Sequence, residues 1–594
     1  MKSSLIPTSL FLLFIFSILQ QSSGQTIAPA LTTDWTNAGY RGNIDANATA
    51  LDVTTLGIIG DSITDNSTAL NAAISAAAGN RTILFFPAGN YLFNSPIQLN
   101  DSIVLRGACS DSTHFQFNFN GSSGYCISGS GSNTATSFPV NSGYQKDNNF
   151  VVVADSGYFG TGDWAEIQQD NGTWDTQPIS WADNSIGQLI EITGRNGDTI
   201  FFNKPLRITF DGTLNVRISK INPIREVVLE CFSYERIDSV SCFCPTINFR
   251  YAVDCMVRGI EGKRSISAHV LLDASSNITV TGSYFHDAFE YNGSSMHGYG
   301  VALYYHTGQC LIENNIMRKL RHSFSFQCGA NGNVTAYNYS LEPNRSEFPS
   351  NYGADISMHG HYPFSNLFEG NIVQNIQLDQ TWGPSGPYNT FFRNRAELYG
   401  ILMSSGTVNS DLQNFVGNEV TSTAFLQGNY TITGAGHFQF GNNIRGTITP
   451  TGTGTMTDSS YYLSAAPDYW ITGTTWPSIG PGTSLNSGTI AAKERFNSSR
   501  KTVCGNESTT TLPEISSSRK LFTLYPNPNS GRFLLTTSSP STSMNVVVAD
   551  TYGRIVFQSN LKSGEIIDLG KTPGVYILSI TTENRTENVR LVIQ

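Results

Sequence analysis

The sequence predicts an all-β chain wound as a parallel β-helix, and three observations favour this fold. A short motif recurs, as in NLFEGN from Asn366 to Asn371, in which an Asn follows a small or polar residue by five positions. The copies stand 23, 33, 23, 24 and 24 residues apart, a spacing typical of solenoids. β-Branched and aromatic residues alternate within the copies, without helical periodicity or the leucine pattern of leucine-rich repeats. The repeated residues are Asn315, Asn338, Asn371, Asn394, Asn418 and Asn442.

This series of residues, the Asn ladder, is expected to be architectural. The coils of a β-helix stack about 4.8 Å apart, so equivalent side chains lie above one another. An Asn at each turn tolerates left-handed backbone, and its amide can bond to the Asn of the next coil. A further copy begins at Asn277 and places Gly282 in the ladder position, 33 residues before Asn315.

The N-terminus has the pattern of a secretory signal peptide, residues 1–24. Met1 and Lys2 precede an apolar run from Leu10 to Leu19, and small residues stand at Ser22 and Gly24. This order predicts cleavage near Gln25. The run is short for a membrane span, and the small residues favour cleavage over an uncleaved anchor. The mature chain is therefore expected to be soluble, without a transmembrane segment.

Composition and cysteine content narrow the classes of partner. Only 13% of the 594 residues are charged and the formal net charge is −10, which argues against nucleic acid as a partner. Among nine Cys residues, Cys231, Cys242, Cys244 and Cys255 cluster without a nearby His. Their spacing is unlike that of a zinc site, and export permits disulfides. We expect these four residues to be buried or disulfide-linked, with the pairing left open.

The segment from Asp52 to Gly107 resembles the opening of the pectate-lyase superfamily, in the variant shared by rhamnogalacturonase-like and epimerase-like proteins. The resemblance implies a right-handed parallel β-helix (pectin-lyase-like) over residues 25–490, with an N-terminal cap region at about 50–107. A cap helix is expected over roughly Ser67 to Ala78, with Asp65 or Asn66 near its N-cap. The matching residues are Asp52, Gly57, Gly60, Asp61, Asp65, Thr68, Ala69, Ile74, Phe86, Pro87, Gly89, Tyr91 and Gly107.

The chain departs from the best-known pectinases of that superfamily. The polygalacturonase set of NTD, DD and GHG is missing, and so is the WIDH motif of plant-type pectate lyases. No catalytic residue is therefore transferred from those families, and one fold hosts many activities.

The C-terminal residues 523–594 resemble the sorting domain of the type IX secretion system of Bacteroidetes-type bacteria. The motifs are LYPNPNSGRFLL from Leu524, VVVADTYGRIV from Val546 and the final RLVIQ. The resemblance implies a small β-sandwich, type IX secretion machinery as a partner, and a secreted or outer cell-surface location. An ordinary adhesive sandwich is the alternative, which the YPNP start disfavours. Residues 491–522 are rich in Ser and Thr and are expected to form a linker.

Two long steps of the repeat are expected to be loops on a binding face. They contain HDAFEYNGSSMHGYG and EPNRSEFPSNYGADISMHGHY, and seven of the nine His residues lie between His269 and His361. Alternation along the neighbouring strands turns Val301, Leu303, Phe324, Phe326, Ile356 and Met358 inward. The other parity faces outward: Ala302, Tyr304, His306, Arg321, Ser323, Ser325, Gln327, Asp355, Ser357, His359 and His361. Stacking then brings Tyr304, Gln327 and His359 together, with Arg321 and Asp355 near the edge.

This outward patch suits a lyase acting on an acidic, uronate-containing polysaccharide by β-elimination. The reaction needs a base, an acid and a positive charge for the carboxylate. The catalytic candidates are His359, Tyr304, Arg321, His361, His306 and Asp355, and Ca²⁺ is a further candidate for neutralising the carboxylate. The substrate-binding candidates are Gln327, Trp382, Tyr388, Arg393, His286 and Asp287.

Other interpretations stay open. Hydrolysis would need two carboxyl groups, for which Asp287, Asp355, Asp379 and Glu397 are the candidates. A third hypothesis is a non-catalytic glycan-binding or adhesive β-helix. His322 shares the parity of Phe324 and is expected to be a core residue. His286 and Asp287 could merely order their loop, Trp382 and Tyr388 could pack a turn, and His359 with His361 could bind a metal but lack a third ligand. A monomer is expected.

Overall fold

The computed structural model describes residues 26–43, 48–498 and 500–504, and 522–593 apart from short gaps at 526–528, 538–542, 551–553, 563–564, 571 and 583–584. The predicted signal peptide lies outside the described residues. The chain divides into two compact units, Met1–Thr509 and Thr510–Gln594.

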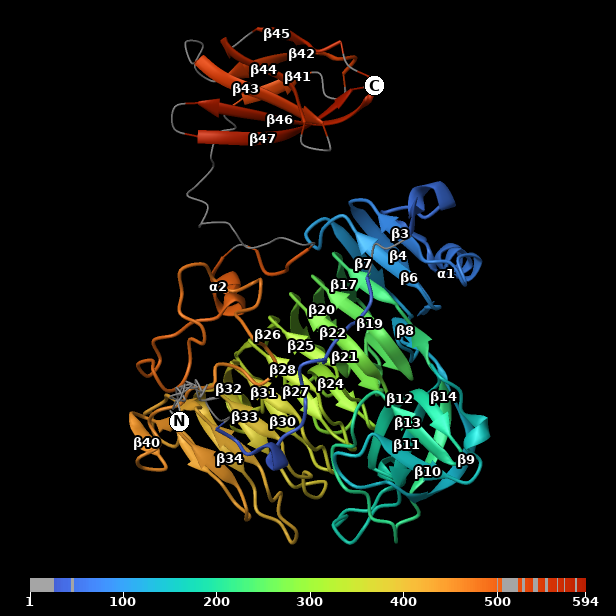
Figure 1. The fold of residues 1–594 in the computed structure, drawn as a ribbon, viewed down its shortest axis with the longest axis vertical. Coiled ribbons are helices and arrows are strands. Elements are labelled where there is room, and N and C mark those ends of the chain that lie inside the picture. Colours follow the sequence, from blue (N-terminus) through green and yellow to red (C-terminus); the bar gives the residue numbers. More distant parts are fainter. Residues whose placement is uncertain are drawn as a thin grey trace, which may run out of the picture. The chain divides into compact units, whose positions relative to one another are not determined.

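The first unit is a right-handed parallel β-helix whose coils contribute strands to three sheets (Figure 1). The first sheet contains β1 (Thr49–Asp52), β3 (Thr82–Phe86), β6 (Ile103–Gly107), β16 (Val228–Glu230), β19 (Ala252–Arg258), β22 (Ser276–Thr281), β25 (Leu311–Glu313), β28 (Val334–Ala336), β31 (Leu367–Glu369), β33 (Thr390–Phe392), β35 (Asn414–Val416) and β38 (Phe438–Phe440), with β15 (Ile224–Arg225) pairing to β19.

The second and third sheets are joined because β32 (Ile372–Leu378) and β34 (Arg395–Met403) run through both. The second contains β2 (Asp61–Asp65), β4 (Gly89–Phe93), β7 (Thr113–Phe117), β17 (Ser233–Arg236), β20 (Glu261–Ser265), β23 (Tyr284–Ala288), β26 (Ile316–Arg318), β29 (Tyr339–Leu341), β36 (Glu419–Val420) and β39 (Asn442–Ile444), to which β40 (Thr447–Thr449) pairs antiparallel. The third contains β5 (Ile97–Gln98), β8 (Ile127–Ser130), β18 (Ile247–Arg250), β21 (Ala268–Asp273), β24 (Tyr299–Tyr304), β27 (His322–Phe326), β30 (Ile356–Met358) and β37 (Asn429–Thr431).

The interior of the coils is a continuous apolar column, as alternation predicted. Phe368, Phe391 and Phe415 stack on successive coils with ring centroids 4.8 and 5.2 Å apart. The six side chains predicted to point inward all lie fully buried in this core: Val301, Leu303, Phe324, Phe326, Ile356 and Met358.

The Asn ladder is confirmed as a stack of amides at the corner between the first and second sheets. The side chain of Asn371, for example, donates to Asn394 Oδ1 at 2.9 Å and to Thr335 O at 2.7 Å. Its own Oδ1 accepts from the backbone and side-chain amides of Asn338, each at 3.0 Å. The same pattern links every step from Asn315 to Asn442.

Two details of the predicted ladder are wrong. The left-handed residue of the corner is the one before each ladder Asn, for example Asn314 and Gly370 with φ of 55° and 65°. For the same reason the ladder position of the earlier coil is Ser283, whose backbone amide donates to Asn315 Oδ1, and the left-handed Gly282 precedes it. Asn333, Asn366, Asn389 and Gln413 form a second stack that was visible only as polar residues starting each repeat.

The cap helix α1 (Ser67–Ala76) covers the N-terminal end of the column with Leu70 and Ile74, as predicted. Asn66 is its N-cap residue, while the Asp65 carboxylate accepts from Ser67 N at 3.0 Å. Short 3₁₀ turns occur at η1 (Pro29–Leu31), η2 (Val53–Leu56), η3 (Ser156–Tyr158), η4 (Ser180–Ala182) and η5 (Ser350–Tyr352).

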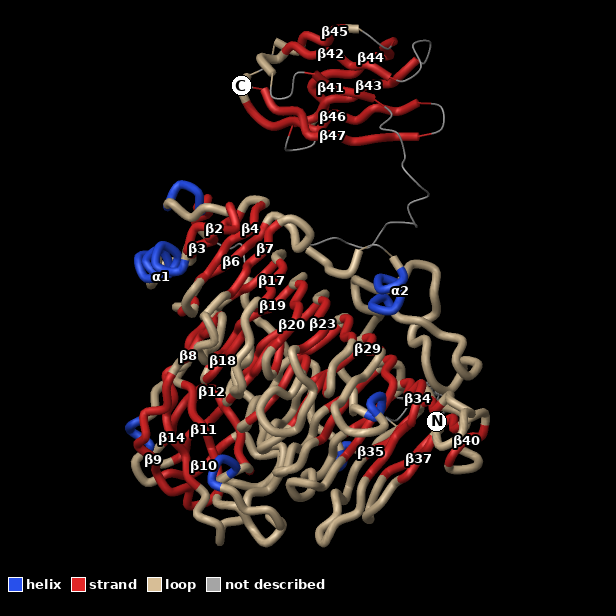
Figure 2. Tube along the Cα trace, turned by 180° about the vertical axis from the view of Figure 1, so that it is seen from behind, coloured by secondary structure: helices blue, strands red, loops and turns tan. Residues whose placement is uncertain are grey.

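A barrel that the repeat pattern does not predict is inserted between β8 and β15. Its antiparallel strands close on themselves around their own apolar core: β9 (Ser132–Ser142), β10 (Phe150–Val153), β11 (Trp164–Gln169), β12 (Ile186–Asn196), β13 (Thr199–Phe202) and β14 (Arg217–Asn222). Because β8 belongs to the third sheet and β15 to the first, the barrel stands at the end of the third-sheet strands. Figure 2 shows it beside the coils.

The predicted start of the linker, at residue 491, is wrong. Residues 491–504 belong to the first unit, because α2 (Ala491–Asn497) buries Ala491 and Ala492. Arg495 Nη2 donates to Asn314 O at 2.6 Å, and Thr502 is buried. The Ser/Thr-rich composition of this segment gave no indication that it packs on the first unit.

The second unit, described by itself, is the predicted small β-domain. One antiparallel sheet holds β41 (Phe522–Tyr525), β42 (Arg532–Thr537) and β45 (Ile566–Asp568). The other holds β44 (Ile555–Lys562), β43 (Ser543–Asp550), β46 (Gly574–Thr582) and β47 (Arg585–Ile593). Side chains from both sheets, among them Phe533, Val546 and Leu578, form one apolar core.

Candidate functional site on the third sheet

The outer face of the third sheet carries the predicted row of polar side chains. Leu303, Phe326 and Met358 pair in register, so the residues that follow them, Tyr304, Gln327 and His359, lie side by side. Asp379 extends this row, because Leu378 pairs with Met358. The predicted register is therefore confirmed, and it adds a carboxylate that had been considered only for hydrolysis.

The strands bend where they enter the third sheet, and simple alternation fails there. Ser323 and Asp355 point inward: both bond to Ser340, at 2.7 and 2.6 Å, and Ser340 pairs with the core residue Met317. The next residue along β27, Phe324, also points inward, so two successive side chains share one face. The expectation that Ser323 and Asp355 face outward is therefore wrong, and so is the core position expected for His322.

His322 instead belongs to a line of rings on the outer face, which we call the histidine face: His297, Tyr299, His322, His359 and Asp379. Ring centroids are 5.0 Å apart for His297 and Tyr299, 4.8 Å for Tyr299 and His322, and 5.4 Å for His322 and His359. Alternation alone could not identify this line, because the bend turns Tyr299 and His322 outward.

His359 and Asp379 form a hydrogen-bonded pair at the end of this line. His359 Nδ1 lies 2.6 Å from Asp379 Oδ2. Burial raises the pKa of Asp379, but the charge and hydrogen bond of His359 outweigh this and hold that pKa below its usual value. An ionised carboxylate can only accept, so Nδ1 carries the proton and Nε2 of the neutral ring presents a lone pair. Within the described part of the chain, Nε2 has no hydrogen-bond partner.

His322 presents a second imidazole lone pair. Its Nδ1 lies 3.0 Å from the carbonyl oxygen of Ala354, which can only accept, so Nε2 is unprotonated in the neutral ring. Burial, with the nearby charges of His359 and Arg321, lowers the pKa of His322 far below its usual value. Tyr299 is the complementary donor: burial raises its pKa to about 12, although the charge of Arg321 opposes this. When both imidazoles are neutral, the face therefore presents two acceptors, and Tyr299 adds one phenol donor.

Several buried polar atoms beside this face have no hydrogen-bond partner among the described residues. They are Ser325 Oγ, Ser357 Oγ, His322 Nε2 and Arg321 Nε. Such atoms are rare in folded proteins, and hydroxyl or carboxylate groups of a ligand would satisfy them.

Three loops flank the entrance of the third-sheet strands: residues 237–246, 289–298 and 342–355. The latter two are the predicted insertions. Arg321 joins them, because Nη1 donates to Asn292 O at 3.3 Å and Nη2 pairs with Glu347 at 3.2 Å. Arg321 directly precedes β27, and its side chain holds both loops.

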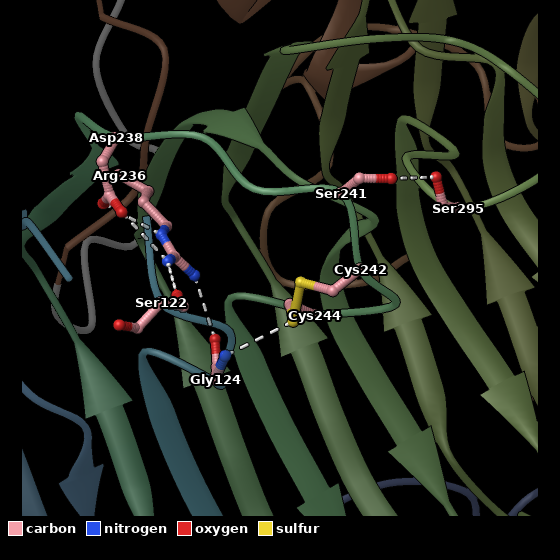
Figure 3. Close-up of a disulfide and its surroundings, with 8 residues drawn as sticks. All are labelled: Ser122, Gly124, Arg236, Asp238, Ser241, Cys242, Cys244 and Ser295. Atoms are coloured by element: carbon pink, nitrogen blue, oxygen red, sulfur yellow. Dashed lines mark hydrogen bonds and ion pairs between the residues drawn. A yellow bond between two sulfur atoms is a disulfide. The ribbon is translucent and has the colours of Figure 1, made fainter. Parts of the chain in front are cut away.

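The loop 237–246 contains a disulfide between Cys242 and Cys244, which answers part of the open pairing (Figure 3). Ser241 bonds to Ser295 of the neighbouring loop at 2.8 Å, and Cys244 Sγ accepts from Gly124 N at 3.4 Å. Phe243, between the two cysteines, is 40% exposed and lies 5.6 Å from the His297 ring and 6.3 Å from the Tyr304 ring. Phe243 was not among the predicted site residues, although the CFC motif between loop residues could have indicated it.

The seven cysteines outside this disulfide are free thiols in the structure. Cys231 and Cys255 of the predicted cluster are both buried, as expected for a structural role.

Two predicted catalytic histidines lie at the junction with the barrel. β24 ends at Tyr304, and left-handed Tyr305 and His306 turn the chain away. His306 Nδ1 lies 2.7 Å from Glu166 Oε1, and His306 Nε2 lies 2.7 Å from Asn184 O. The prediction that His306 faces outward beside Tyr304 is therefore wrong.

His361 also follows a turn, since β30 ends at Met358 and φ of His361 is 53°. Its fully buried ring lies between Trp181 of the barrel, 5.0 Å away, and Trp382, 6.0 Å away. His361 thus does not share the outer face with His359, which disagrees with the expected pair on one strand face. Trp382 follows Asp379 by three residues, and its ring lies 5.7 Å from the ring of Trp181, which is 40% exposed.

The remaining predicted site residues lie elsewhere. Asp355 is buried and accepts from the backbone of Gln374 and Asn375 at 2.7 and 2.9 Å, so it orders the corner. His286 and Asp287 bond to each other on the second sheet. Arg393 is buried and donates to backbone oxygens of Asp458 and Ile479, and Tyr388 packs beside Lys146 of the barrel. The sequence predicted Asp355 as a catalytic residue and the other four as substrate-binding residues.

Within the described residues, no three His, Cys, Asp or Glu side chains are grouped as a metal site. The histidine face offers Asp379 as its carboxylate, and that group is bonded to His359. Ca²⁺ prefers six to eight oxygen ligands, so these residues do not fit it.

Comparisons with known proteins agree with both resemblances. Residues 50–207 match the family described as rhamnogalacturonase A/epimerase, pectate lyase-like, and residues 523–594 match the secretion system C-terminal sorting domain. A search of curated proteins gives no match.

Solved structures with similar coils share little sequence with this chain. The tailspike of Pseudomonas phage phi297 is 13% identical, with 65% of this chain and 67% of that chain covered and a TM-score of 0.43. The A-module of an Azotobacter vinelandii mannuronan C-5 epimerase is 12% identical, with 64% of this chain and 79% of that chain covered and a TM-score of 0.32. The catalytic domain of a GH87 alpha-1,3-glucanase is 11% identical, with 64% of this chain and 55% of that chain covered and a TM-score of 0.33.

In the described part of the chain, no helix has the length and apolar character needed to cross a membrane. The chain combines a pectate-lyase-like parallel β-helix with a type IX C-terminal sorting domain, which directs it to the cell surface or the medium.

Proposed function

We propose that the protein is an exported polysaccharide lyase that cleaves a uronate-containing glycan by β-elimination on the histidine face. The observation that carries the proposal is the His359–Asp379 pair at 2.6 Å, placed 5.4 Å from His322 on the outer side of the third sheet. A carboxylate that fixes the tautomer of an imidazole is a recurrent arrangement for a general base.

In this proposal His359 Nε2 removes the proton at C5 of the uronate, next to its carboxyl group. Asp379 stabilises the imidazolium that forms, through Nδ1. The electron pair forms the C4–C5 double bond and expels the glycosidic oxygen at C4, which must receive a proton. Tyr299 is the proposed acid, because its raised pKa of about 12 keeps the phenol protonated at neutral pH.

Arg321 is the proposed counter-charge for the uronate carboxylate. Its Nε is buried without a partner in the described part of the chain, while its Nη atoms hold the two inserted loops. A negative charge developing on the carboxylate would be stabilised by such a preorganised donor. Phe243 on one side and Trp181 with Trp382 on the other are proposed to contact sugar rings.

The positions of the four candidate carboxyl groups favour elimination over hydrolysis. Hydrolysis by the common mechanisms uses two carboxyl groups on either side of the bond. Of the four candidates, Asp379 lies on the histidine face and Asp355 is buried in the corner. Glu397 is paired with Lys493 at 2.9 Å, and Asp287 lies on the second sheet.

The test is a screen of the exported protein on polygalacturonate, alginate and glucuronate-containing polysaccharides, with and without a chelator. A rise in ultraviolet absorbance from the unsaturated uronate supports elimination. New reducing ends without that absorbance would establish hydrolysis instead. Retained binding of a glycan with neither signal would establish a non-catalytic binding protein.

A further inference from the structure

Residues 500–504, the last described part of the first unit, cross the corner between the first and second sheets. Val503 N donates to Gly282 O at 2.8 Å, and the Thr502 hydroxyl bonds to Ser110 Oγ at 2.6 Å. Cys504 Sγ contacts Gly259 O at 3.6 Å. Because Gly259 and Gly282 are the left-handed corner residues of successive coils, this segment runs across the coils.

Cys231 occupies the same corner position one coil earlier. Glu230 pairs in register with Arg258, so Cys231 lies beside Gly259, and its φ of 61° matches that of the other corner residues. Adjacent coils stand about 4.8 Å apart, and Cys504 already touches Gly259. The two thiols are consequently neighbours at this corner, and each shifts the pKa of the other.

We propose that Cys231 and Cys504 form a disulfide once the protein is exported, fastening the end of the β-helix unit to its own corner. Disulfides form in the oxidising compartments that an exported protein passes, and the sorting domain establishes the export. The other buried thiols, Cys126, Cys255, Cys310 and Cys328, lie within the coils. The bond would act six residues before the second unit begins at Thr510, so the end of the β-helix would stay in place whatever happens to the tail.

The chemistry is thiol–disulfide exchange with an oxidant of the protein-disulfide class. The Cys504 thiolate attacks one sulfur of the oxidant's disulfide, forming a mixed disulfide and releasing one thiolate of the oxidant. The Cys231 thiolate then attacks Cys504 Sγ and displaces the oxidant's second thiolate. Two thiols of this chain are oxidised and one disulfide of the oxidant is reduced to a dithiol, whose two thiolates take up, through solvent, the two protons that the cysteines lose.

The two cysteines suit these successive roles. Cys504 is half-buried, whereas Cys231 is buried. The hydrogen bond from Cys231 lowers the pKa of Cys504 and burial opposes this, so Cys504 is the first thiolate to form.

The experiment is peptide mapping of the full-length exported protein under non-reducing conditions, after blocking free thiols. We expect a linked peptide containing Cys231 and Cys504. The link should be lost in Cys231→Ser and in Cys504→Ser, and kept in Cys109→Ser, whose half-buried thiol precedes the Ser110 that bonds to Thr502. Melting of the first unit should fall by several degrees in Cys504→Ser or on reduction, because a loop of more than two hundred residues is released.

Two results would overturn the proposal. One is recovery of both residues as blocked thiols from the exported protein, even after treatment with oxidised glutathione. The other is a linked peptide that joins Cys504 to Cys109. Either result stands independently of any glycan activity.

Discussion

Glu369 is a buried carboxyl group on the outer side of the first sheet, beneath the segment that follows the last coil. It accepts from Tyr337 Oη and from Tyr461 N, both at 2.9 Å. Burial raises its pKa from 4.5 to about 7, although these hydrogen bonds oppose the shift. The folded state therefore holds the proton more tightly than the unfolded state.

This raised pKa predicts a pH dependence of stability. Below pH 4.5 both states are protonated and the contribution is fully present; it is lost as pH rises to about 7. Compared with Glu369→Gln, the free energy of unfolding of the wild type should fall by roughly 3 kcal/mol over that range. Urea denaturation at several pH values measures it, with the exposed Glu494→Gln as control. Parallel curves for wild type and Glu369→Gln would contradict the raised pKa.

Phe243 is expected to contribute binding rather than chemistry. Its ring is held over His297 and Tyr304 by a disulfide-closed loop. Loss of one aromatic contact with a sugar costs about 1–1.5 kcal/mol, so Phe243→Ala should raise KM about tenfold with kcat little changed. Phe425, 90% exposed on another loop, is the matched control. An unchanged KM for Phe243→Ala would remove this ring from the proposed binding surface.

At the scale of elements, the Asn ladder holds the corner of every coil from Asn315 to Asn442. Asn371→Ala removes the bonds to Thr335 O and Asn394 and leaves the Asn338 amides without their acceptor. We expect a loss of about 2–4 kcal/mol in unfolding free energy. The ladder lies on a different corner from the histidine face, so substrate affinity should not change.

The exposed Asn497→Ala supplies the control for the ladder, since Asn497 belongs to no coil. Unchanged thermal stability together with lost activity in Asn371→Ala would mean that the ladder has a functional rather than an architectural role.

The elements that the sequence predicted are those that repeat. The ladder and the inward residues such as Phe324 and Phe326 were predictable, because each coil needs the same side chain in the same place. The bend at Ser323 was not, because alternation assumes a straight strand. His359 and Asp379 stand twenty residues apart on neighbouring coils, so their pairing depends on a register that only the structure supplies. The barrel strands carry no repeat, so the pattern of the coils could not predict them.

At the scale of the whole molecule, the two compact units predict where the chain can be shortened. A chain ending at Thr509 should keep the melting temperature and activity of the first unit. A chain ending at Asn497 should melt several degrees lower, because Thr502 is buried and Val503 bonds to Gly282. Calorimetry of the two shortened proteins decides. Equal melting temperatures would show that residues 498–504 add nothing to the fold.

The central claim is that the glycan is cleaved on the histidine face, and the rate of unsaturated-uronate formation by His359→Gln tests it most directly. On a polysaccharide cleaved by the wild type, this variant should be slower by about 10²–10⁴-fold. Its melting temperature should hardly move, because His359 is partly exposed. His286→Gln, on the second sheet, should keep the wild-type rate. A His359→Gln protein that is folded and still forms unsaturated uronate at the wild-type rate would contradict the account.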